Sequence, residues 1–235
     1  MTIGAFLRLA WTAATFLVVQ ILVCGVAALP VARLWGWIVE MTTGNTLLRF
    51  AALGFVLVPS YALFALCLIV LAPLTTRLLG WRTPANAEMR IAEMGWPVLG
   101  WARYMASLHV VRVLAGSLFR GSPIWSAYLR LSGARVGRRV YIASLALSDY
   151  NLLEFGDDVV IGSDAHISAH TVERGLVKTA GVRLGDGVLI GLGAVVDIGV
   201  EAGDGCQVGA LTLVPKHARL EAGAVYAGIP AARIR

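Results

Sequence analysis

Two histidines in the second half of the chain are the residues best suited to do chemistry. His166 and His170 are four residues apart, and Glu173 follows three residues later. Histidine gains and loses a proton near neutral pH, so His170 could act as a general base, with Glu173 orienting its ring. The two histidines could instead form a metal-binding pair, but the nearby sequence supplies no third ligand. We therefore expect a proton-transfer site at His170 and no metal.

A six-residue repeat predicts the elements that hold these side chains. Each unit begins with an apolar residue, and its fifth residue is small or β-branched. A fifth residue and the next first residue are two apart, so both point to the same face of an extended strand, into a core. The repeat therefore predicts coils of three short strands and three turns. The units start at Val136, Ile142, Phe155, Ile161, Ile167, Leu184, Ile190, Val196, Ala202, Val208, Val214 and Leu220.

The turns and two breaks in the repeat carry further information. Glycine occupies many second positions, where we expect the chain to turn without the steric cost of a Cβ atom. The repeat contains one extra residue around positions 148–151, and Leu184 follows Ile167 at a spacing of seventeen. We expect the second break to be a loop near residues 171–182 that leaves the coils beside His170. Loops that project from a repeat scaffold usually carry its function.

The first half of the chain has the composition of a membrane segment. Of the 235 residues, 58% are hydrophobic and 14% are charged, which is more apolar than a typical soluble domain. The apolar runs at residues 9–29 and 47–72 reach the roughly 20 residues that a bilayer-spanning helix needs. A cleaved signal peptide is the alternative for the first run, although its apolar part would be only about 7–15 residues. We expect a transmembrane hairpin within residues 1–80.

The distribution of charge predicts how this hairpin is oriented. The net charge of +6 is concentrated before the repeat, which indicates anionic membrane lipids rather than nucleic acid as partners. Arg8 precedes the first run, and Arg77 and Arg82 follow the second, so both termini should be cytoplasmic. Between residues 86 and 119 the apolar pattern is broken by charges, which favours helices lying in the membrane interface, and we expect residues 81–133 to form this neck.

Two sets of motifs resemble known families. The repeat and residues 227–233, AGIPAAR, resemble the hexapeptide-repeat acyltransferases, and residues 209–216 resemble the penultimate coil of that family. The chain as a whole is similar to the membrane-embedded C-terminal modules of poly-ε-lysine-synthetase-type nonribosomal peptide synthetases. That similarity lies in the lead-in at 128–137, in NLLEFGDD at 151–158 and in residues 170–178.

These resemblances imply a membrane α plus all-β fold. Two N-terminal transmembrane helices and the interfacial neck would precede a left-handed parallel β-helix at residues 134–235. The family implies a homotrimer, and the membrane would be of the bacterial inner-membrane type, with the β-helix on the cytoplasmic side.

The resemblances also imply an activity. An acyl or aminoacyl group would move from a phosphopantetheine thioester, either acyl-CoA or a separate carrier protein, to a hydroxyl or amine, with His170 as the base. The family positions of the donor-binding residues correspond to Gly193, Ala194, Ala210, Pro215, Lys216 and Arg233, the last two contacting phosphates. The alternatives are an amide-ligating module of a nonribosomal peptide synthetase system and a non-catalytic trimeric scaffold.

Overall fold

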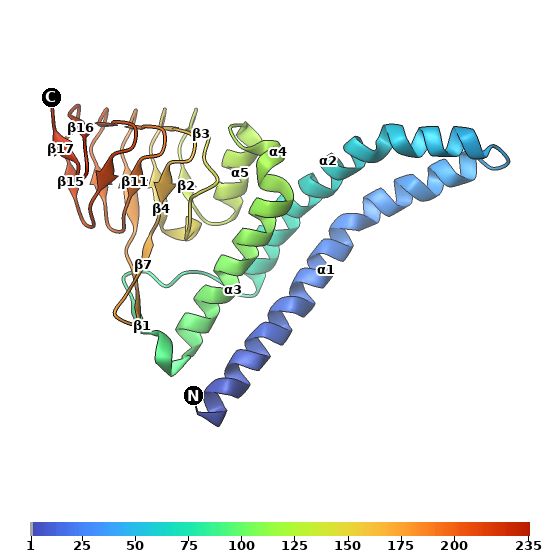
Figure 1. Ribbon diagram of the computed structural model, residues 1–235, viewed down its shortest axis with the longest axis horizontal. Coiled ribbons are helices and arrows are strands. Elements are labelled where there is room, and N and C mark those ends of the chain that lie inside the picture. Colours follow the sequence, from blue (N-terminus) through green and yellow to red (C-terminus); the bar gives the residue numbers. More distant parts are fainter. Residues whose placement is uncertain (1) are drawn as a thin grey trace.

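Two long helices form the N-terminal part of the structure, a computed structural model that describes residues 2–235. Helix α1 spans Ile3–Met41 and α2 spans Thr46–Leu78. The side chains of Thr2 and Asn45 cap their first turns by accepting hydrogen bonds from backbone N–H groups. Both helices are long and apolar enough to cross a membrane. They extend beyond the predicted apolar runs, and their far ends project from the rest of the molecule as a hairpin (Figure 1).

A second layer of shorter elements connects α2 to the coils. It contains β1 (Glu88–Arg90), a 3-10 turn (Ile91–Glu93), α3 (Trp96–Val111), a π-helical turn (Arg112–Gly116), α4 (Ser117–Phe119) and α5 (Pro123–Leu131). Polar side chains of α3 bond to α1: Gln20 Nε2 donates to Ser107 Oγ at 3.1 Å, and Arg103 donates to Thr15 Oγ1 at 2.8 Å. The predicted neck is therefore helical, with α3 packed against both long helices.

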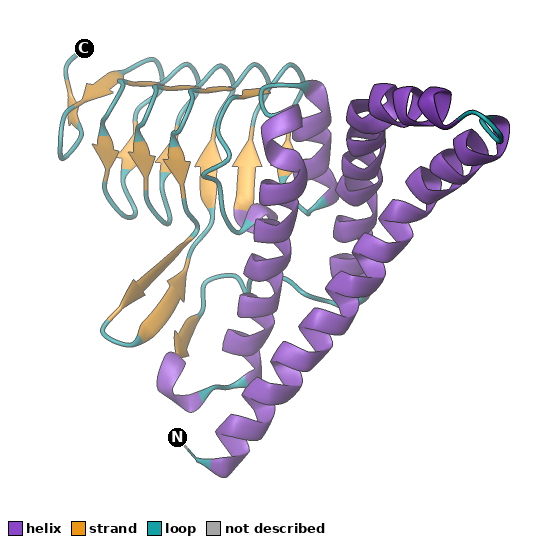
Figure 2. Cartoon of the chain, turned by 45° about the vertical axis from the view of Figure 1, so that its right-hand side comes forward, coloured by secondary structure: helices purple, strands orange, loops and turns teal. Residues whose placement is uncertain are grey.

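The strands that follow α5, apart from β7 and β8, stack as a three-sided prism of coils (Figure 2). All twelve predicted unit starts are confirmed as the last residues of strands. Three parallel sheets result, with the orders β2-β4-β9-β12-β15, β3-β5-β10-β13-β16 and β6-β11-β14, and β17 closes the second sheet in the antiparallel sense. The strands are β2 (Arg135–Val136), β3 (Tyr141–Ile142), β4 (Leu153–Phe155), β5 (Val160–Ile161), β6 (His166–Ile167), β9 (Val182–Leu184), β10 (Leu189–Ile190), β11 (Val195–Val196), β12 (Glu201–Ala202), β13 (Gln207–Val208), β14 (Leu213–Val214), β15 (Arg219–Leu220), β16 (Val225–Ala227) and β17 (Ala232–Arg233).

One apolar core runs from the prism into the helices. First-position residues such as Ile161 and Ile190 and fifth-position residues such as Val188 and Cys206 are buried inside the coils. The same cluster continues through Trp125 and the buried side chains of α3 to the facing sides of α1 and α2. Burial of this continuous surface fixes the helices relative to the first coils.

The second-position glycines are needed for a different reason from the one predicted. At Gly191, for example, the backbone does not adopt a positive φ, but an added Cβ atom would lie 2.5 Å from the backbone N of Ala210 in the next coil. Positive φ occurs instead at the fourth position, with 65° at Gly187 and 58° at Asp158. Close stacking of the coils therefore excludes side chains at many second positions, and the sharp turn lies two residues later.

The second phase break is a β hairpin rather than an irregular loop. Strands β7 (His170–Glu173) and β8 (Leu176–Thr179) pair in the antiparallel sense, and β1 adds a third strand beside β8. Thr171, the fifth residue of the unit that begins at Ile167, lies in this hairpin, in β7 opposite Lys178. The hairpin leaves the prism after β6 and extends towards the segment that follows α2 (Figure 2).

Candidate active site

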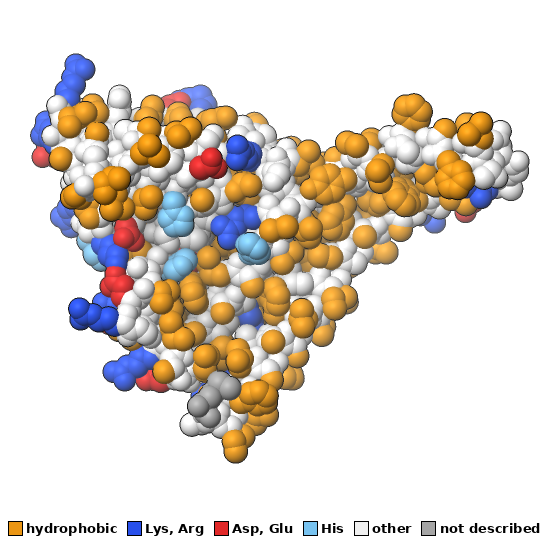
Figure 3. Space-filling view, viewed as in Figure 1, with side chains coloured by type: hydrophobic (Ala, Val, Ile, Leu, Met, Phe, Trp, Pro, Cys, Tyr) orange, Lys and Arg blue, Asp and Glu red, His pale blue; other side chains and the backbone are white. Residues whose placement is uncertain are grey.

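His170 lies where the hairpin leaves the second coil. It is the first residue of β7, and 22% of its side-chain surface is exposed. The ring of Trp101 on α3 contacts the imidazole edge to face, with the ring centres 5.1 Å apart. Figure 3 shows histidine side chains gathered on the face that joins the helices to the coils, next to Lys or Arg. The imidazole is therefore packed on one side and open on the other.

Asp149 is the side chain that orients His170. Its Oδ2 atom lies 2.5 Å from His170 Nδ1, and its side chain is completely buried. The other oxygen, Oδ1, accepts hydrogen bonds from Thr83 Oγ1 at 2.6 Å and from Trp101 Nε1 at 3.1 Å. Residue 149 itself has a left-handed backbone, with φ of 52°, which turns the carboxylate towards the hairpin.

The environment of Asp149 determines which imidazole nitrogen is free to react. Burial raises the pKa of the Asp149 carboxyl, but the hydrogen bonds from His170 and Thr83 lower it more, so the net shift is downward. An ionised carboxylate only accepts hydrogen bonds, so the bonded nitrogen, Nδ1, must carry the proton when the ring is neutral. The Nε2 atom then has a free lone pair and can act as a base.

Ser168 and Ser148 complete the support of the ring. Ser168 Oγ donates to the backbone O of His170 at 2.7 Å, and Ser148 Oγ donates to Ser168 Oγ at 3.1 Å. Both hydroxyls lie about 3.5 Å from Nδ1, which is too far for strong hydrogen bonds. These serines hold the backbone at the start of β7, while Asp149 holds the side chain.

Glu173 does not orient His170, contrary to the sequence-based expectation. It forms an ion pair with Lys216 of the later coils. Residues 170 and 173 are three apart in β7, so their side chains point to opposite faces of the strand. An irregular loop at this segment would lack such alternation, but the segment is strand β7.

His166 lies near His170 but does not form a metal site with it. It projects from the outer face of β6, in register with Val195. Partial burial, and then the charge of His170, lower the pKa of His166. Among residues 2–235, no group of three or more His, Cys, Asp or Glu side chains is arranged to hold a metal ion.

The predicted donor-binding residues fall into three places. Gly193, Ala194 and Ala210 lie at stacked corners of neighbouring coils, where the backbone N of Leu211 donates to the O of Leu192 at 2.9 Å. Pro215 and Lys216 follow β14 at the next corner, and Lys216 reaches the hairpin through Glu173. Arg233 lies in β17 and pairs with Glu221. Gly193, Ala194 and Ala210 thus precede strands β11 and β14, and Pro215 and Lys216 lie at the opposite end of these strands. Arg233 lies apart from both groups.

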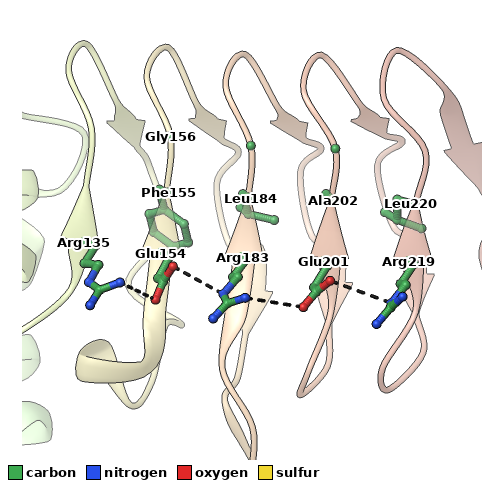
Figure 4. Close-up of a pocket in the computed structure, with 12 residues that line it drawn as sticks. Arg135, Glu154, Phe155, Gly156, Arg183, Leu184, Glu201, Ala202, Arg219 and Leu220 are labelled. Carbon is green, nitrogen blue, oxygen red and sulfur yellow. Dashed lines mark hydrogen bonds and ion pairs between the residues drawn. The ribbon is translucent and has the colours of Figure 1, made fainter.

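A charged ladder on another face was not anticipated from the sequence. Arg135, Glu154, Arg183, Glu201 and Arg219 alternate in sign up the sheet β2-β4-β9-β12-β15, with ion-pair distances of 3.0 to 3.8 Å (Figure 4). They line a groove of about 570 Å³ that includes none of the predicted site residues. Exposed pairs of this kind contribute little stability each, and here they connect successive coils across one sheet.

One feature of the sequence, the first break in the repeat, points to Asp149, which was not predicted as a site residue. Asp149 lies in the first phase break, around residues 148–151, where one extra residue interrupts the repeat. In the structure that extra residue lets the chain adopt the left-handed conformation and a 3-10 turn at Tyr150–Leu152. Thr83 and Trp101 had no comparable signal, because they lie outside the repeat and are 66 and 48 residues from Asp149.

Comparison with known proteins finds the same two groups that the motifs resemble. No protein-family model matches the chain. It is 25% identical over 168 residues to delta-poly-L-ornithine synthetase of Acinetobacter baumannii, a match that covers 70% of this chain and 12% of that protein. The chain therefore corresponds to a small part of this curated relative.

Similar solved structures include a hexapeptide-repeat containing acetyltransferase and a galactoside acetyltransferase. One from Vibrio cholerae has a TM-score of 0.42 and 18% identity, and the match covers 55% of this chain and 91% of that one. A galactoside acetyltransferase in complex with coenzyme A has a TM-score of 0.45 and 19% identity, over 58% of this chain and 82% of that one. The hexapeptide-repeat acetyltransferase agrees with the first resemblance stated from the sequence, and the match to a poly-L-ornithine synthetase is consistent with the second.

Proposed function

We propose that the chain is an acyltransferase of the hexapeptide-repeat type that uses His170 as its general base. The observation that carries this proposal is the His170–Asp149 pair, in which a buried carboxylate holds Nδ1 at 2.5 Å while the ring stays partly open to solvent. Such an arrangement stabilises the positive charge that forms on the ring when Nε2 takes up a proton. The repeat and the closing AGIPAAR motif support the same reaction class.

The reaction follows from the chemistry of a thioester. His170 Nε2 removes the proton from the acceptor hydroxyl or amine while the oxygen or nitrogen of the acceptor forms a bond to the thioester carbon. The carbon–sulfur bond then breaks, and the thiolate of the phosphopantetheine group takes the proton back from Nε2. The products are the ester or amide and the free thiol, and His170 is neutral again.

The proposed donor is acyl-CoA, bound along the last coils by Gly193, Ala194, Ala210, Pro215, Lys216 and Arg233. Gly193 is partly exposed and Ala210 is exposed, and their small size leaves room for a pantetheine arm, whereas Ala194 is fully buried. Lys216 and Arg233 would contact phosphates by exchanging their carboxylate partners, Glu173 and Glu221, for phosphate oxygens. A carrier protein that presents the same arm is the second donor to be tested.

Aminoacyl transfer to an amine is a second candidate. It is favoured by the match to delta-poly-L-ornithine synthetase, which covers 70% of this chain. The same base serves both reactions, because His170 Nε2 can take a proton from an amine as well as from a hydroxyl.

The proposal places the enzyme on a bacterial inner membrane, with α1 and α2 inserted and the prism on the cytoplasmic side. Exposed apolar side chains on both helices, such as Leu22 and Phe55 at 61% and 86%, support insertion into lipid. The arginines at 8, 77 and 82 would then lie near anionic headgroups. We take the coils to be left-handed, as in the family that the repeat resembles.

We take the active assembly to be a homotrimer. The outer face of the sheet β3-β5-β10-β13-β16 carries an apolar row, in which Tyr141, Val160 and Leu189 are 50%, 38% and 40% exposed. A row of this kind, repeated on three copies, would be covered by association.

Turnover by the detergent-purified protein tests the function. Free thiol release from acyl-CoA and from an acylated carrier protein is followed, and mass spectrometry identifies products from a pool of hydroxyl and amine acceptors. His170→Ala should lower kcat by roughly 10²–10⁴-fold and leave CoA affinity unchanged. His109→Ala on the exposed surface of α3 is the matched control. Full turnover by His170→Ala, or no thiol release by the folded wild type from either donor, would overturn the proposal.

A further inference from the structure

Two side chains from outside the coils bond directly to Asp149. Thr83 belongs to the linker, residues 79–87, that follows α2, and Trp101 belongs to α3. Both donate to the same carboxylate oxygen, Oδ1, at 2.6 and 3.1 Å. The other oxygen, Oδ2, is thereby directed to His170 Nδ1. The linker and α3, which precede the prism in the chain, therefore supply hydrogen bonds to the His170–Asp149 pair, whose two residues belong to the prism and its hairpin.

The Thr83 hydroxyl is itself held in place. Asn151 accepts a hydrogen bond from the backbone N of Thr83 at 3.1 Å and donates one to its backbone O at 2.9 Å. These two bonds fix the backbone of the linker against the first coil, and only 1% of the Thr83 surface is exposed. The hydroxyl has little freedom to move away from Asp149.

Trp101 contacts both members of the pair. Its indole N–H donates to Asp149, and the edge-to-face contact of its ring restricts the His170 imidazole. A buried carboxylate becomes more costly with each donor that it loses, so the removal of either Thr83 or Trp101 as a donor favours rotation of Asp149 or loss of its charge. Either change would weaken the bond that keeps the proton on His170 Nδ1.

We propose that Thr83 and Trp101 are positioning residues that set the reactive tautomer of His170 through Asp149. This inference rests on the proposed function, because it assigns them a role in the same proton transfer. It also makes the catalytic geometry depend on the docking of the linker and α3, the elements that connect the prism to the two apolar helices.

A purely structural role is the competing explanation, and Thr179 allows the two to be separated. Thr179 Oγ1 donates to the O of Pro84 at 2.7 Å and accepts from the N of Ala87 at 3.0 Å. It therefore docks the same linker onto the hairpin without touching Asp149. Thr179→Val is the matched control for Thr83→Val, since both substitutions remove a buried hydroxyl and keep the side-chain shape.

The test combines kinetics with a measurement of the tautomer. Thr83→Val and Trp101→Phe should lower kcat about 10- to 100-fold, by analogy with the loss of partners that orient metal-ligating histidines, with little change in the KM for the donor. Thr83→Ser should restore kcat, because it returns the hydroxyl. In ¹⁵N spectra of histidine-labelled protein, assigned by the loss of one ring signal in His170→Ala, the Nδ1–H form of His170 should be diminished in Thr83→Val and retained in Thr179→Val.

Each outcome bears on one proposal or the other. Wild-type kcat and tautomer in Thr83→Val, or equal losses of kcat in Thr83→Val and Thr179→Val with the tautomer unchanged, would reject the positioning role. If His170→Ala is fully active, the proposed function fails. The tautomer measurement then still reports whether Thr83 acts on His170.

Discussion

Asp149 is the residue on which the candidate site depends most directly. Asp149→Asn preserves the shape of the side chain, but its amide can donate to Nδ1 and so favour the tautomer with the proton on Nε2. We expect kcat to fall by roughly 10²–10⁴-fold, similar to the loss in His170→Ala. Because the two residues act as a unit, Asp149→Asn combined with His170→Ala should be no slower than His170→Ala alone. Steady-state turnover of the three variants measures this, and multiplicative losses would contradict it.

The same carboxylate should make stability dependent on acidic pH. The native pKa of Asp149 is below its ordinary value of 3.8, so folding favours its ionised form. Its contribution is present above about pH 4 and is lost as the pH falls through the lower native pKa. In thermal unfolding in detergent, the wild type should exceed Asp149→Asn in Tm at pH 5 to 7, and the difference should close below about pH 4. A difference that widens with acid would show the opposite shift.

Of the His170–Asp149 pair, only His170 can be predicted from the sequence. His170 was predicted because its residue type, the phase break beside it and the family resemblance agree. Asp149 lies in a break that was noticed, but an interrupted repeat does not reveal which side chain turns inward. Glu173 was chosen because it is near in sequence, yet strand alternation directs it to Lys216. Contacts made by the linker and α3 depend on packing between segments far apart in the chain, which no local pattern encodes.

At the scale of elements, the distance between stacked coils limits the size of the side chain that fits at the second position of each repeat unit. Gly191→Ala would place a Cβ atom 2.5 Å from the backbone of the next coil, whereas at Gly209 the nearest atoms would be 3.4 Å away. Both glycines occupy the same position of the repeat, so Gly209→Ala is a matched control. We expect Gly191→Ala to destabilise the protein by about 1–3 kcal/mol and Gly209→Ala to have a much smaller effect. Chemical denaturation in mild detergent measures both, and equal effects would contradict the stacking argument.

The strands could be predicted closely because each coil obeys a simple rule. An apolar residue recurs every six positions, and the structure places a strand end at each one. The reason for the glycines could not be predicted, since it depends on the distance between coils rather than on the local backbone. The hairpin was predicted as a loop because β1, the strand that extends its sheet, lies far earlier in the chain.

For the whole molecule, the proposed insertion of α1 and α2 predicts on which side of the membrane each segment lies. A reporter fused after Thr43, in the turn between α1 and α2, should be active as a periplasmic protein, and one fused to the C-terminus as a cytoplasmic protein. Arg33→Glu, near the turn, is a control that should not reverse this pattern, since Arg8, Arg77 and Arg82 remain. A cytoplasmic signal after Thr43 would contradict insertion of the hairpin.

The assembly can be tested through its apolar row. We expect a trimer in native mass spectrometry from mild detergent, and Val160→Glu combined with Leu189→Glu should convert it to monomers because charges would be buried between copies. Val172→Glu, at a more exposed apolar position on the hairpin, should leave the trimer intact. A wild-type monomer with full activity would contradict the proposal.

The coil dimensions also limit how this molecule can change in length during evolution. Leu184, Ala202 and Leu220 occupy equivalent places on one sheet and are eighteen residues apart. An insertion of six residues would move every later strand to the neighbouring side, so the ion-pair ladder and the apolar row would each be split between two sides. Insertions of eighteen residues keep each row intact, and so do excursions at a corner, such as the β7–β8 hairpin. Related prisms should therefore differ in length by whole coils or by hairpins at the corners, and the hairpin that carries His170 is an example of the second route.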